Sequence, residues 1–438
     1  MRRALKAGIA LVVLFTPVLL AQTSSALIDP FTISYLGAFR VPVVDDGSYG
    51  TFDYSDAALA YYPNGDAGGA TDGYPGSLFI NSHPYASKVA ELTIPAPSTS
   101  RTLSDLPVAQ ILQPFTQVRG GLAAGFIMGM TYLPSENRIY FTSSDDYLDG
   151  GCAPINLSAP LIAPALGSFL PTLSSPAPEG AWYLKVGSTV IHPYMTSRYI
   201  FDVPKAFADS YLGGRTLASG RHRGWCSTNG PQIYSWASVA ASNPANKTAL
   251  PATTLLQYGT DSQSVNGFSP TNNYQGAAFL TAGTQSAVLI SGLIEFDPAR
   301  AYYGYDNWKV STDCDGIVPF PCTGTRGWRA ADPHPAMQFY NPADLAAVAS
   351  GQKQSWQLQP YATLNLLPYM LKAYPPTMNV NSSEGETIVS SFDRARGLIY
   401  VTETRVDGLR PVVHVFRIGG GTTTVVTPKP PSNVYIIR

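Results

Sequence analysis

Charged residues are scarce in this chain: Asp, Glu, Lys and Arg make up 13% of its 438 residues. An average globular protein has about a quarter, so uncharged polar residues and Tyr must cover much of the surface. The 28 basic and 29 acidic side chains leave no positive excess to collect phosphates, which argues against nucleic-acid binding. The composition also excludes a coiled coil, and the 45% hydrophobic content excludes a disordered chain.

The motifs of several common enzyme classes are also missing. There is no Gly-x-Ser-x-Gly around a nucleophile, no P-loop and no dinucleotide-binding glycine pattern. We therefore expect no organic cofactor. A structural Ca²⁺ stays open at two oxygen-rich turns, although neither has the spacing of an EF-hand. These turns contain Asp145, Asp146 and Asp149 in one case and Asn64, Asp66 and Asp72 in the other.

The first 26 residues resemble an export signal. Basic side chains precede an apolar run from Ala7 to Leu20, and Ser24 and Ala26 suit the positions before a cleavage site. The run is short and contains Pro17, so an uncleaved membrane anchor is the weaker interpretation. We expect a secreted or periplasmic protein with no membrane span in the mature chain.

The cysteines fit an oxidising compartment. No CxxC or Cys/His cluster has the spacing of metal ligands, so disulfides are preferred over a metal site. The four residues are Cys152, Cys226, Cys314 and Cys322. Cys314 and Cys322 bracket a short loop that a disulfide closes easily. Cys152 and Cys226 then pair by default, although three connectivities remain formally open.

Two strand patterns recur along the chain. The first is a hairpin of alternating apolar residues around a turn, at 58–63 with 77–80, 130–134 with 138–141, and 389–393 with 397–401. The second is a strand that ends in Asp or Asn beside a Pro, which can open a short helix, at 199–204, 294–298 and 338–342. The spacing of these prolines is compatible with a unit of roughly 45 residues, the size of a propeller blade.

On these hairpins and strand–Pro–helix units, the chain resembles a secreted bacterial β-propeller of no characterised family. The resemblance implies an all-β fold of seven or eight four-stranded blades, in which the segments 31–36 and 412–418 share one blade and close the ring. It divides the chain into a signal peptide at 1–26, a propeller at 27–418 and a Gly/Pro-containing tail at 419–438. A β-helix or a pair of sandwiches is the alternative fold.

Three histidines, His83, His192 and His334, each directly precede a proline. The residue before a proline favours an extended backbone, and the proline itself is disfavoured in a central strand. We expect them where strands leave the sheets, where they either converge as acids, bases or ligands or merely cap turns. His83 and His192 share the tripeptide His-Pro-Tyr, which adds Tyr85 and Tyr194 as neighbours. His414 alternates within an apolar strand and is interpreted as a satisfied core residue.

The segment 221–226 is the densest cationic part of the chain, and a second Arg/Trp loop lies at 324–329. Guanidinium groups bind carboxylates and sulfates with two hydrogen bonds, but the alternative interpretation of each segment is a solvated loop. By analogy with propeller-fold polysaccharide lyases, the catalytic candidates are His83, His192, Tyr194 and His222. The substrate-binding candidates are Tyr85, Arg221, Arg223, Trp225, Arg326 and Trp328.

Two functions remain open on the sequence. In the first, the propeller binds or cleaves an extracellular, acidic polysaccharide as a lyase or glycoside hydrolase. His and Arg would then neutralise a carboxylate while Tyr exchanges a proton. In the second, it is a non-catalytic exported scaffold that binds a protein or cell-envelope partner. Convergence of the candidate side chains in one pocket would favour the first function.

Overall fold

The computed structural model describes residues 26–55, 57–120, 126–144, 165–192, 195–221, 229–239, 242, 244–258, 272–296, 302–303, 328–329, 333–372 and 388–419. Over these residues the protein is all-β, as predicted, with two short α-helices, α1 (Lys205–Tyr211) and α2 (Pro342–Ala349). Single 3-10 turns lie in its connections: η1 (Pro30–Thr32), η2 (Gly69–Thr71), η3 (Leu103–Asp105) and η7 (Ser355–Gln357). No helix in these ranges is long and apolar enough to cross a membrane.

Five antiparallel sheets of four strands each make up most of the described chain. From its inner to its outer strand, the first sheet contains β22 (Ser390–Asp393), β23 (Leu398–Asp407), β24 (Arg410–Arg417) and β2 (Ser34–Arg40). The second contains β3 (Leu59–Tyr62), β4 (Ser77–Asn81), β5 (Lys88–Thr93) and β6 (Ile111–Gln117). The third contains β7 (Phe126–Leu133), β8 (Arg138–Ser144), β9 (Ala165–Phe169) and β10 (Glu179–Val186).

The last two sheets follow the same plan. The fourth contains β12 (Tyr199–Asp202), β13 (Leu217–Gly220), β14 (Asn229–Trp236) and β15 (Ala249–Tyr258). The fifth contains β16 (Asn273–Ala282), β17 (Gln285–Glu295), β20 (Pro333–Tyr340) and β21 (Ala362–Asn365). Short strands extend the edges: β1 (Ala26–Leu27) on β17, β11 (Thr189–Val190) on β10, and the pair β18 (Tyr302–Tyr303) and β19 (Trp328–Arg329). A parallel pairing of β10 with β15 joins the third and fourth sheets at their outer edges.

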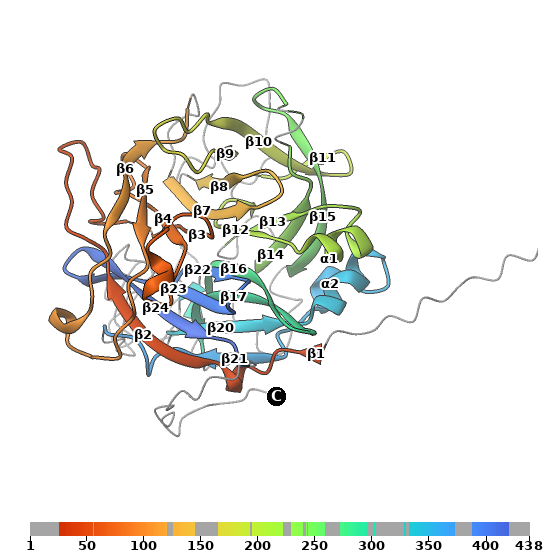
Figure 1. Cartoon of the computed structure of the whole chain (residues 1–438). Coiled ribbons are helices and arrows are strands. Elements are labelled where there is room, and N and C mark those ends of the chain that lie inside the picture. Colours follow the sequence, from red (N-terminus) through yellow and green to blue (C-terminus); the bar gives the residue numbers. More distant parts are fainter. Residues whose placement is uncertain are drawn as a thin grey trace, which may run out of the picture.

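The five sheets stand around a common centre (Figure 1). Their innermost strands contact one another in a closed cycle, from β22 to β3, β7, β12, β16 and back to β22. This is the arrangement of a β-propeller, in which each four-stranded sheet is a blade. The described residues form five such blades and not the predicted seven or eight. The prediction was wrong because each blade, with its long connections, takes more chain than the 45-residue unit assumed from the proline spacing.

The predicted closure of the ring is confirmed. The N-terminal strand β2 pairs antiparallel with the C-terminal strand β24, and Phe39 faces Val413 in the register. The two strands complete the first blade together, so residues from both ends of the chain share one sheet. The three predicted hairpins also form, as β3–β4, β7–β8 and β22–β23, and two of the predicted strand–Pro units lead into α1 and α2.

Apolar side chains pack between neighbouring blades and hold the ring together. Large clusters fill each of the five spaces between blades. On β12, Tyr199 and Phe201 pack toward the fifth blade, whereas the alternate residue Ile200 packs toward the third. Because both faces of an inner strand are buried in this way, apolar residues can occupy consecutive positions, as they do throughout β3.

The innermost strands all run in the same direction. Near their beginnings, the Asn81 amide of the second blade donates to the carbonyl oxygen of Ile127 on β7, and the N–H of Ile388 donates to Gln275 on β16. Near their ends, Arg394 beyond β22 donates to the carbonyl oxygen of Phe279 on β16. We call the side of the ring at which these strands begin the start face, and the opposite side the end face.

Candidate functional site

Loops from two blades meet on the start face around the segment that leads into β3. The N–H of His83, in the β4–β5 loop, donates to the carbonyl oxygen of Thr51 at 2.8 Å. The N–H of Tyr54 donates to the carbonyl oxygen of Leu409 at 3.0 Å, in the hairpin between β23 and β24. These backbone bonds bring the first and second blades together next to the predicted residue His83.

Three exposed tyrosines surround His83. Tyr49 is 54% exposed, Tyr54 41% and Tyr85 71%. Their ring centroids lie 5.0, 5.4 and 4.8 Å from that of the imidazole. We call these four residues, together with Arg405, the tyrosine cluster. Flat amphipathic rings that remain open to solvent can stack on the apolar face of a ligand and still offer hydroxyl groups for hydrogen bonds.

A carboxylate fixes the loop that carries Tyr49. Asp46 Oδ1 accepts the N–H groups of Ser48 and Gly50, and Asp46 Oδ2 pairs with the Lys88 ammonium group at 2.5 Å. The hydrogen bond from Lys88, with those from the backbone, holds the pKa of Asp46 well below its usual range. The loop is therefore tied to the first residue of β5 by a group that stays ionised.

The backbone of the tyrosine cluster is strained. Tyr49, Tyr54 and Arg405 have φ angles of 61°, 56° and 54°, in the left-handed region that side chains with a Cβ rarely adopt. Such conformations cost on the order of 1–3 kcal/mol each and tend to collect at binding and catalytic sites. Their concentration here marks the cluster as a candidate site independently of its side chains.

A guanidinium group borders the tyrosines. The Cζ atom of Arg405 lies 5.0 Å from the centroid of the Tyr54 ring. No carboxylate of the described chain lies within ion-pair distance of Arg405. The neighbouring Arg410, by contrast, pairs with Asp407 at 3.1 Å and with Asp53 at 3.9 Å. Arg405 is thus a cation at an aromatic surface that can accept an anionic group.

The hydrogen bonding of His83 defines which of its ring nitrogens can donate a hydrogen bond to a ligand. The N–H of Tyr85 donates to His83 Nδ1 at 3.2 Å, which assigns the proton of the neutral ring to Nε2. Partial burial lowers the pKa of the imidazole, and the nearby Asp53 carboxylate opposes this effect. At neutral pH, His83 is therefore an Nε2–H hydrogen-bond donor, and its remaining lone pair already has a partner.

Two predicted residues, His192 and Arg221, are buried beside the fourth blade, and so is Arg198, which was not predicted. Each of the three is at most 8% exposed. The N–H of Arg198 donates to the carbonyl oxygen of Gly220 at 2.8 Å, which continues the β12–β13 ladder by one residue and sets Arg198 opposite Arg221. Arg198 Nη1 donates to the sulfur of Met128 on β7 at 3.3 Å.

The structure thus brings the predicted residues His83 and Tyr85 together in the tyrosine cluster, and it places His192 and Arg221 among the buried residues beside the fourth blade. Trp328, another predicted residue, lies in the short strand β19. The other predicted site residues lie outside the described ranges, namely Tyr194, His222, Arg223, Trp225 and Arg326, as do the four cysteines, Cys152, Cys226, Cys314 and Cys322.

Sequence reasoning missed Tyr49, Tyr54, Arg198 and Arg405. The available signal was positional. Tyr49 and Tyr54 stand in a segment rich in Asp, Gly and Ser, whereas most tyrosines of this chain stand in apolar strands. Arg198 directly precedes a strand that has no charge before its last residue, in a chain where charges are rare.

Two histidines behave differently from those at the candidate site. His334 was predicted where a strand leaves its sheet, but it lies within β20, opposite Ile294 of β17. The prediction failed because Pro335 sits at the beginning of β20, where the missing N–H is tolerated and the Pro335 carbonyl oxygen still accepts from Leu366. His414 is a satisfied core residue, as predicted, because its ring bonds Glu403 and Tyr35.

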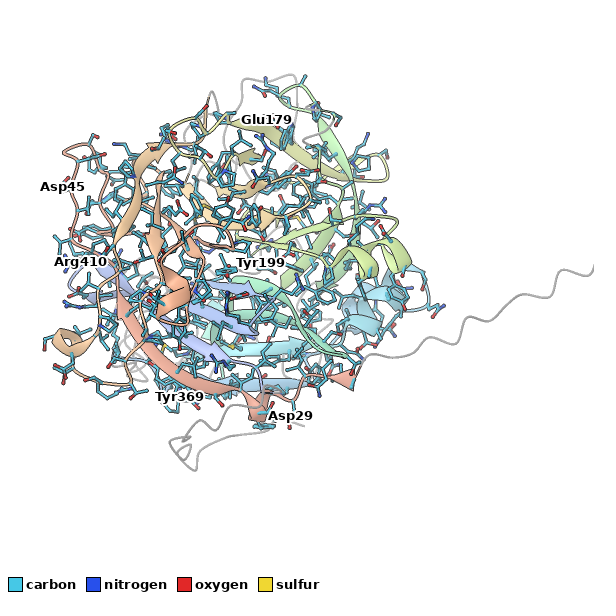
Figure 2. The ribbon with its side chains drawn as sticks, viewed as in Figure 1. Asp29, Asp45, Glu179, Tyr199, Tyr369 and Arg410 are labelled. Atoms are coloured by element: carbon cyan, nitrogen blue, oxygen red, sulfur yellow. The ribbon has the colours of Figure 1, made fainter. Side chains whose placement is uncertain are left out.

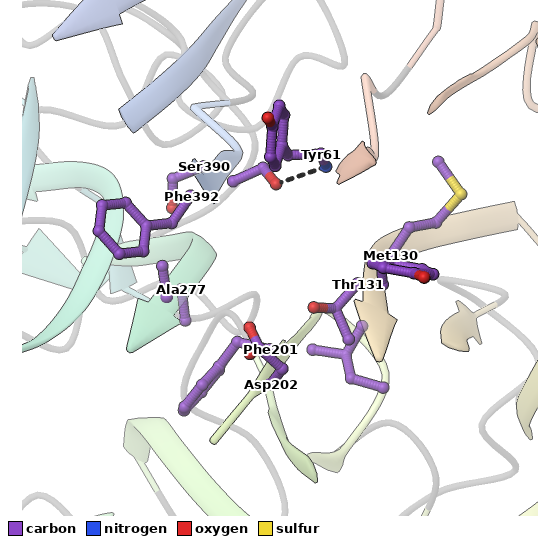
Figure 3. A pocket seen from close by; sticks show the side chains of 12 residues that line it. Tyr61, Met130, Thr131, Phe201, Asp202, Ala277, Ser390 and Phe392 are labelled. Atoms are coloured by element: carbon purple, nitrogen blue, oxygen red, sulfur yellow. Dashed lines mark hydrogen bonds between the residues drawn. The ribbon is translucent and has the colours of Figure 1, made fainter. Parts of the chain in front are cut away.

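A pocket at the centre of the ring was not predicted (Figure 3). All five innermost strands line it, through Tyr61, Thr131, Phe201, Ala277 and Ser390 among others, and its volume is about 310 Å³ including open solvent. The Asp202 carboxylate at its edge pairs with Arg394 at 2.6 Å. The N–H of Tyr61 donates to Ser391 Oγ across two blades. These two interactions join neighbouring or facing blades, and so they stabilise the ring.

No group of three or more His, Cys, Asp or Glu side chains suited to a metal ion occurs among the residues described. Of the two turns at which a structural Ca²⁺ was left open, the one at 64–72 uses its carboxylates locally. Asp66 and Asp72 accept the N–H groups of Gly68 and Tyr74. The turn at 145–149 lies outside the described ranges.

Comparison with known proteins assigns no family. No family model and no curated protein matches the sequence. Among solved structures, the chain is similar to one described as "Crystal Structure of Mitotic Checkpoint Complex", at 8% identity and a TM-score of 0.30, over 95% of this chain and 99% of that one.

Two further solved structures are similar to the chain to a comparable degree. One belongs to a study of the GH130 family of mannoside phosphorylases and of hydrolases that target β-1,2-mannosidic linkages in Candida mannan. It has 8% identity and a TM-score of 0.36, over 89% of this chain and 96% of that one. The other is a GH43_12 protein from capybara gut metagenome, with 8% identity and a TM-score of 0.34, over 92% of this chain and 59% of that one. At this similarity, none of the three assigns an activity to the chain.

Proposed function

We propose that the start face binds an extracellular, acidic polysaccharide and that the tyrosine cluster is its contact surface. The observation that carries this proposal is the group of three exposed tyrosines around His83, bordered by the guanidinium of Arg405. We propose further that the protein acts outside the cytoplasm, in the periplasm or as a secreted protein, because its first 26 residues have the features of an export signal.

Each member of the cluster has a defined role in this proposal. The rings of Tyr54 and Tyr85 stack on the C–H face of a sugar. The Nε2–H of His83 donates to a hydroxyl or carboxylate oxygen, as its tautomer allows. Arg405 pairs with a carboxylate or sulfate of the polymer, which gives the surface its preference for an acidic ligand.

Binding is better supported than cleavage at this surface. A general base needs a free lone pair, and the lone pair of the neutral His83 ring already accepts the N–H of Tyr85. Of the other catalytic candidates, His192 is buried, and Tyr194 and His222 lie outside the described residues. The lyase hypothesis therefore depends on one of these three. We propose a polysaccharide-binding propeller, in which cleavage, where it occurs, uses a base other than His83.

Affinity electrophoresis and calorimetry test the proposal with the chain from residue 27, using oligogalacturonate, a sulfated glycan and a neutral glucan. We expect Tyr85→Ala and Tyr54→Ala each to weaken binding of the acidic polymers on the order of tenfold, or about 1.4 kcal/mol. Arg405→Gln should remove the preference for acidic over neutral polymer. Tyr211→Ala is the matched control, because Tyr211 is also exposed, at 39%, but packs on Phe207 in α1.

Ultraviolet absorbance and reducing ends, followed on the same mixtures, separate binding from cleavage. A rise of both signals would indicate elimination, and a rise of reducing ends alone would indicate hydrolysis. Binding without either signal would support a binding protein. Failure to bind any acidic polymer, or equal loss in the Tyr211→Ala control, would contradict the proposal and favour a scaffold for a protein or cell-envelope partner.

A further inference from the structure

We infer that Arg198 forms an oxyanion site of its own at the start face, which takes a carboxylate or sulfate group of a sugar. The inference deepens the proposed function, because it names the chemical group of the polymer that enters the ring. It rests on that proposal only for the identity of the polymer, and the anion chemistry of Arg198 stands on its own geometry.

Among the described residues, the buried guanidinium of Arg198 has no charged acceptor. The residue is 8% exposed, its Nη1 reaches only the thioether of Met128, and its Nε has no hydrogen-bond partner in the described chain. A thioether is a weak acceptor and carries no charge. Because a buried cation is costly unless it is paired, this arrangement calls for an anion that binds from outside the chain.

Arg138 shows how this protein treats a buried arginine that has only a structural role. It is buried to the same degree as Arg198. Its Nε donates to Ser168 Oγ at 3.0 Å, and its Nη2 donates to the carbonyl oxygen of Ala177 at 2.8 Å and lies 3.3 Å from Glu179. The charge and donors of Arg138 are thus satisfied within one blade, whereas those of Arg198 are not.

The oxyanion site and the tyrosine cluster are linked on the start face through β7. Met128, which contacts Arg198, follows Ile127, whose N–H donates to Ser87 Oγ at 3.3 Å. Ser87 closes the loop of His83, since its N–H donates to the His83 carbonyl oxygen at 3.0 Å. One polymer chain could therefore occupy the tyrosine cluster with one sugar and Arg198 with the acidic group of another.

The ε-methyl group of Met128 provides a direct readout, because its sulfur contacts Arg198. We would label the methionine methyl groups with ¹³C in the chain from residue 27 and assign Met128 with a Met128→Leu variant. Sodium galacturonate, sodium glucose 6-sulfate and glucose are then titrated separately. We expect the Met128 signal to shift with either or both of the anionic sugars and not with glucose, and the sugar that shifts it identifies the anion.

Variants separate binding from a merely structural effect. Arg198→Met should abolish the shift, Arg198→Lys should keep a weaker one, and Arg138→Lys is the matched control that should leave it unchanged. If Arg198→Met does not fold, Arg198→Lys still tests the site, because a weakened anion response in a folded protein supports it. A Met128 signal that no anion moves, or that moves equally in the Arg198 variants, would overturn the inference.

The two proposals can fail separately. If the anion-dependent shift persists while no acidic polymer binds, the oxyanion site stands and the proposed function fails. If polymer binds through the tyrosines but the Met128 signal does not respond to any anion, the proposed function stands and the oxyanion site is wrong. Tyr54→Ala should weaken polymer binding without changing the response of Met128 to the monomeric sugars.

Discussion

Buried charges in this protein generally have specific partners within the chain. Glu403 accepts the N–H groups of Leu371 and Lys372 and bonds the ring of His414. Asp393 accepts from the Arg396 guanidinium and from the backbone of its own turn. Buried Arg198 and the aromatic-bound Arg405, by contrast, have no acidic partner among the described residues, and both lie on the start face.

His83 gives the first prediction at the residue scale. Its pKa is lowered below the usual value of about 6.5, chiefly by burial. We expect an imidazole titration below that value and a neutral ring protonated at Nε2. Since the unfolded chain binds the proton more readily, this group makes the fold less stable as the pH falls from about 6.5 to the folded-state pKa.

Long-range ¹H–¹⁵N spectra of the imidazoles measure both properties, with His83→Gln used for assignment. The same variant should lessen the loss of stability over that pH range. A midpoint at or above 6.5, or a neutral ring protonated at Nδ1, would contradict the role of His83 as an Nε2–H donor.

Asp46 gives the second prediction at this scale. Its pKa is lowered, first by the hydrogen bond from Lys88 and then by those from the backbone. A lowered carboxyl pKa contributes stability that is complete above the unfolded value of about 4 and disappears as the pH falls through the folded value. Asp46→Asn should therefore reduce thermal stability by a constant amount between about pH 5 and 8.

Thermal unfolding of the unchanged protein and of Asp46→Asn across pH checks this expectation. The difference between their melting temperatures should narrow below about pH 4, where protonation of Asp46 begins to remove the interaction that the variant lacks. The variant should also bind acidic polymer less well, since the loop of Tyr49 depends on Asp46. Equal stability at neutral pH would show that the Lys88 pair does not hold this loop.

At the scale of elements, the inner strands owe their close contact to small residues. A Cβ atom added to Gly276 on β16 would lie 2.3 Å from the backbone nitrogen of Ser390 on β22 and 2.5 Å from Ser291 Oγ. Gly129 on β7 meets the backbone of Tyr199 on β12 in the same way. Tyr199 stands near the centre of the molecule (Figure 2), where such contacts close the ring.

Gly276→Ala tests this packing. The clash is with backbone, which cannot move aside without parting two blades, so we expect the free energy of unfolding to fall by about 1–3 kcal/mol or more. Gly68→Ala is the control, because its nearest contact would be Asp66 Oδ1 at 3.2 Å in a loop and its φ of −81° suits alanine. If urea unfolding shows the same loss of unfolding free energy in both variants, close packing at Gly276 does not explain the loss.

Elements of this fold could be predicted where a pattern is local. The alternation around the turns of β3–β4, β7–β8 and β22–β23 identified these hairpins correctly, because side-chain periodicity and turn residues lie close in sequence. His334 was misplaced because a proline rule does not reveal whether Pro335 begins a strand or interrupts one. The tyrosine cluster was predicted only through His83 and Tyr85, since loops from separate blades meet there.

At the scale of the whole molecule, the sequence indicated a ring but not its size. The pairing of β2 with β24 followed from two apolar segments near the ends of the chain and from the need to cover sheet edges. The number of blades depends on how much chain each connection uses, and connection length carries no periodic signal. The proposed oxyanion site could not be predicted from the sequence either, because it depends on the lack of an acidic partner for Arg198 among the described residues.

The closure of the ring gives the last prediction. A chain that begins at residue 42 lacks β2, which leaves β24 as an open edge and removes Phe39 from the core between the first and second blades. We expect the single cooperative unfolding transition to be lost and the protein to associate through β24. A synthetic peptide of residues 27–41 should restore the transition by pairing with that edge.

The control chain, residues 27–418, lacks only the tail and should unfold as the longer chain does. Calorimetry and size-exclusion chromatography decide the matter, because an unchanged midpoint in a monomeric chain from residue 42 would mean that the blades hold the ring without their shared strand.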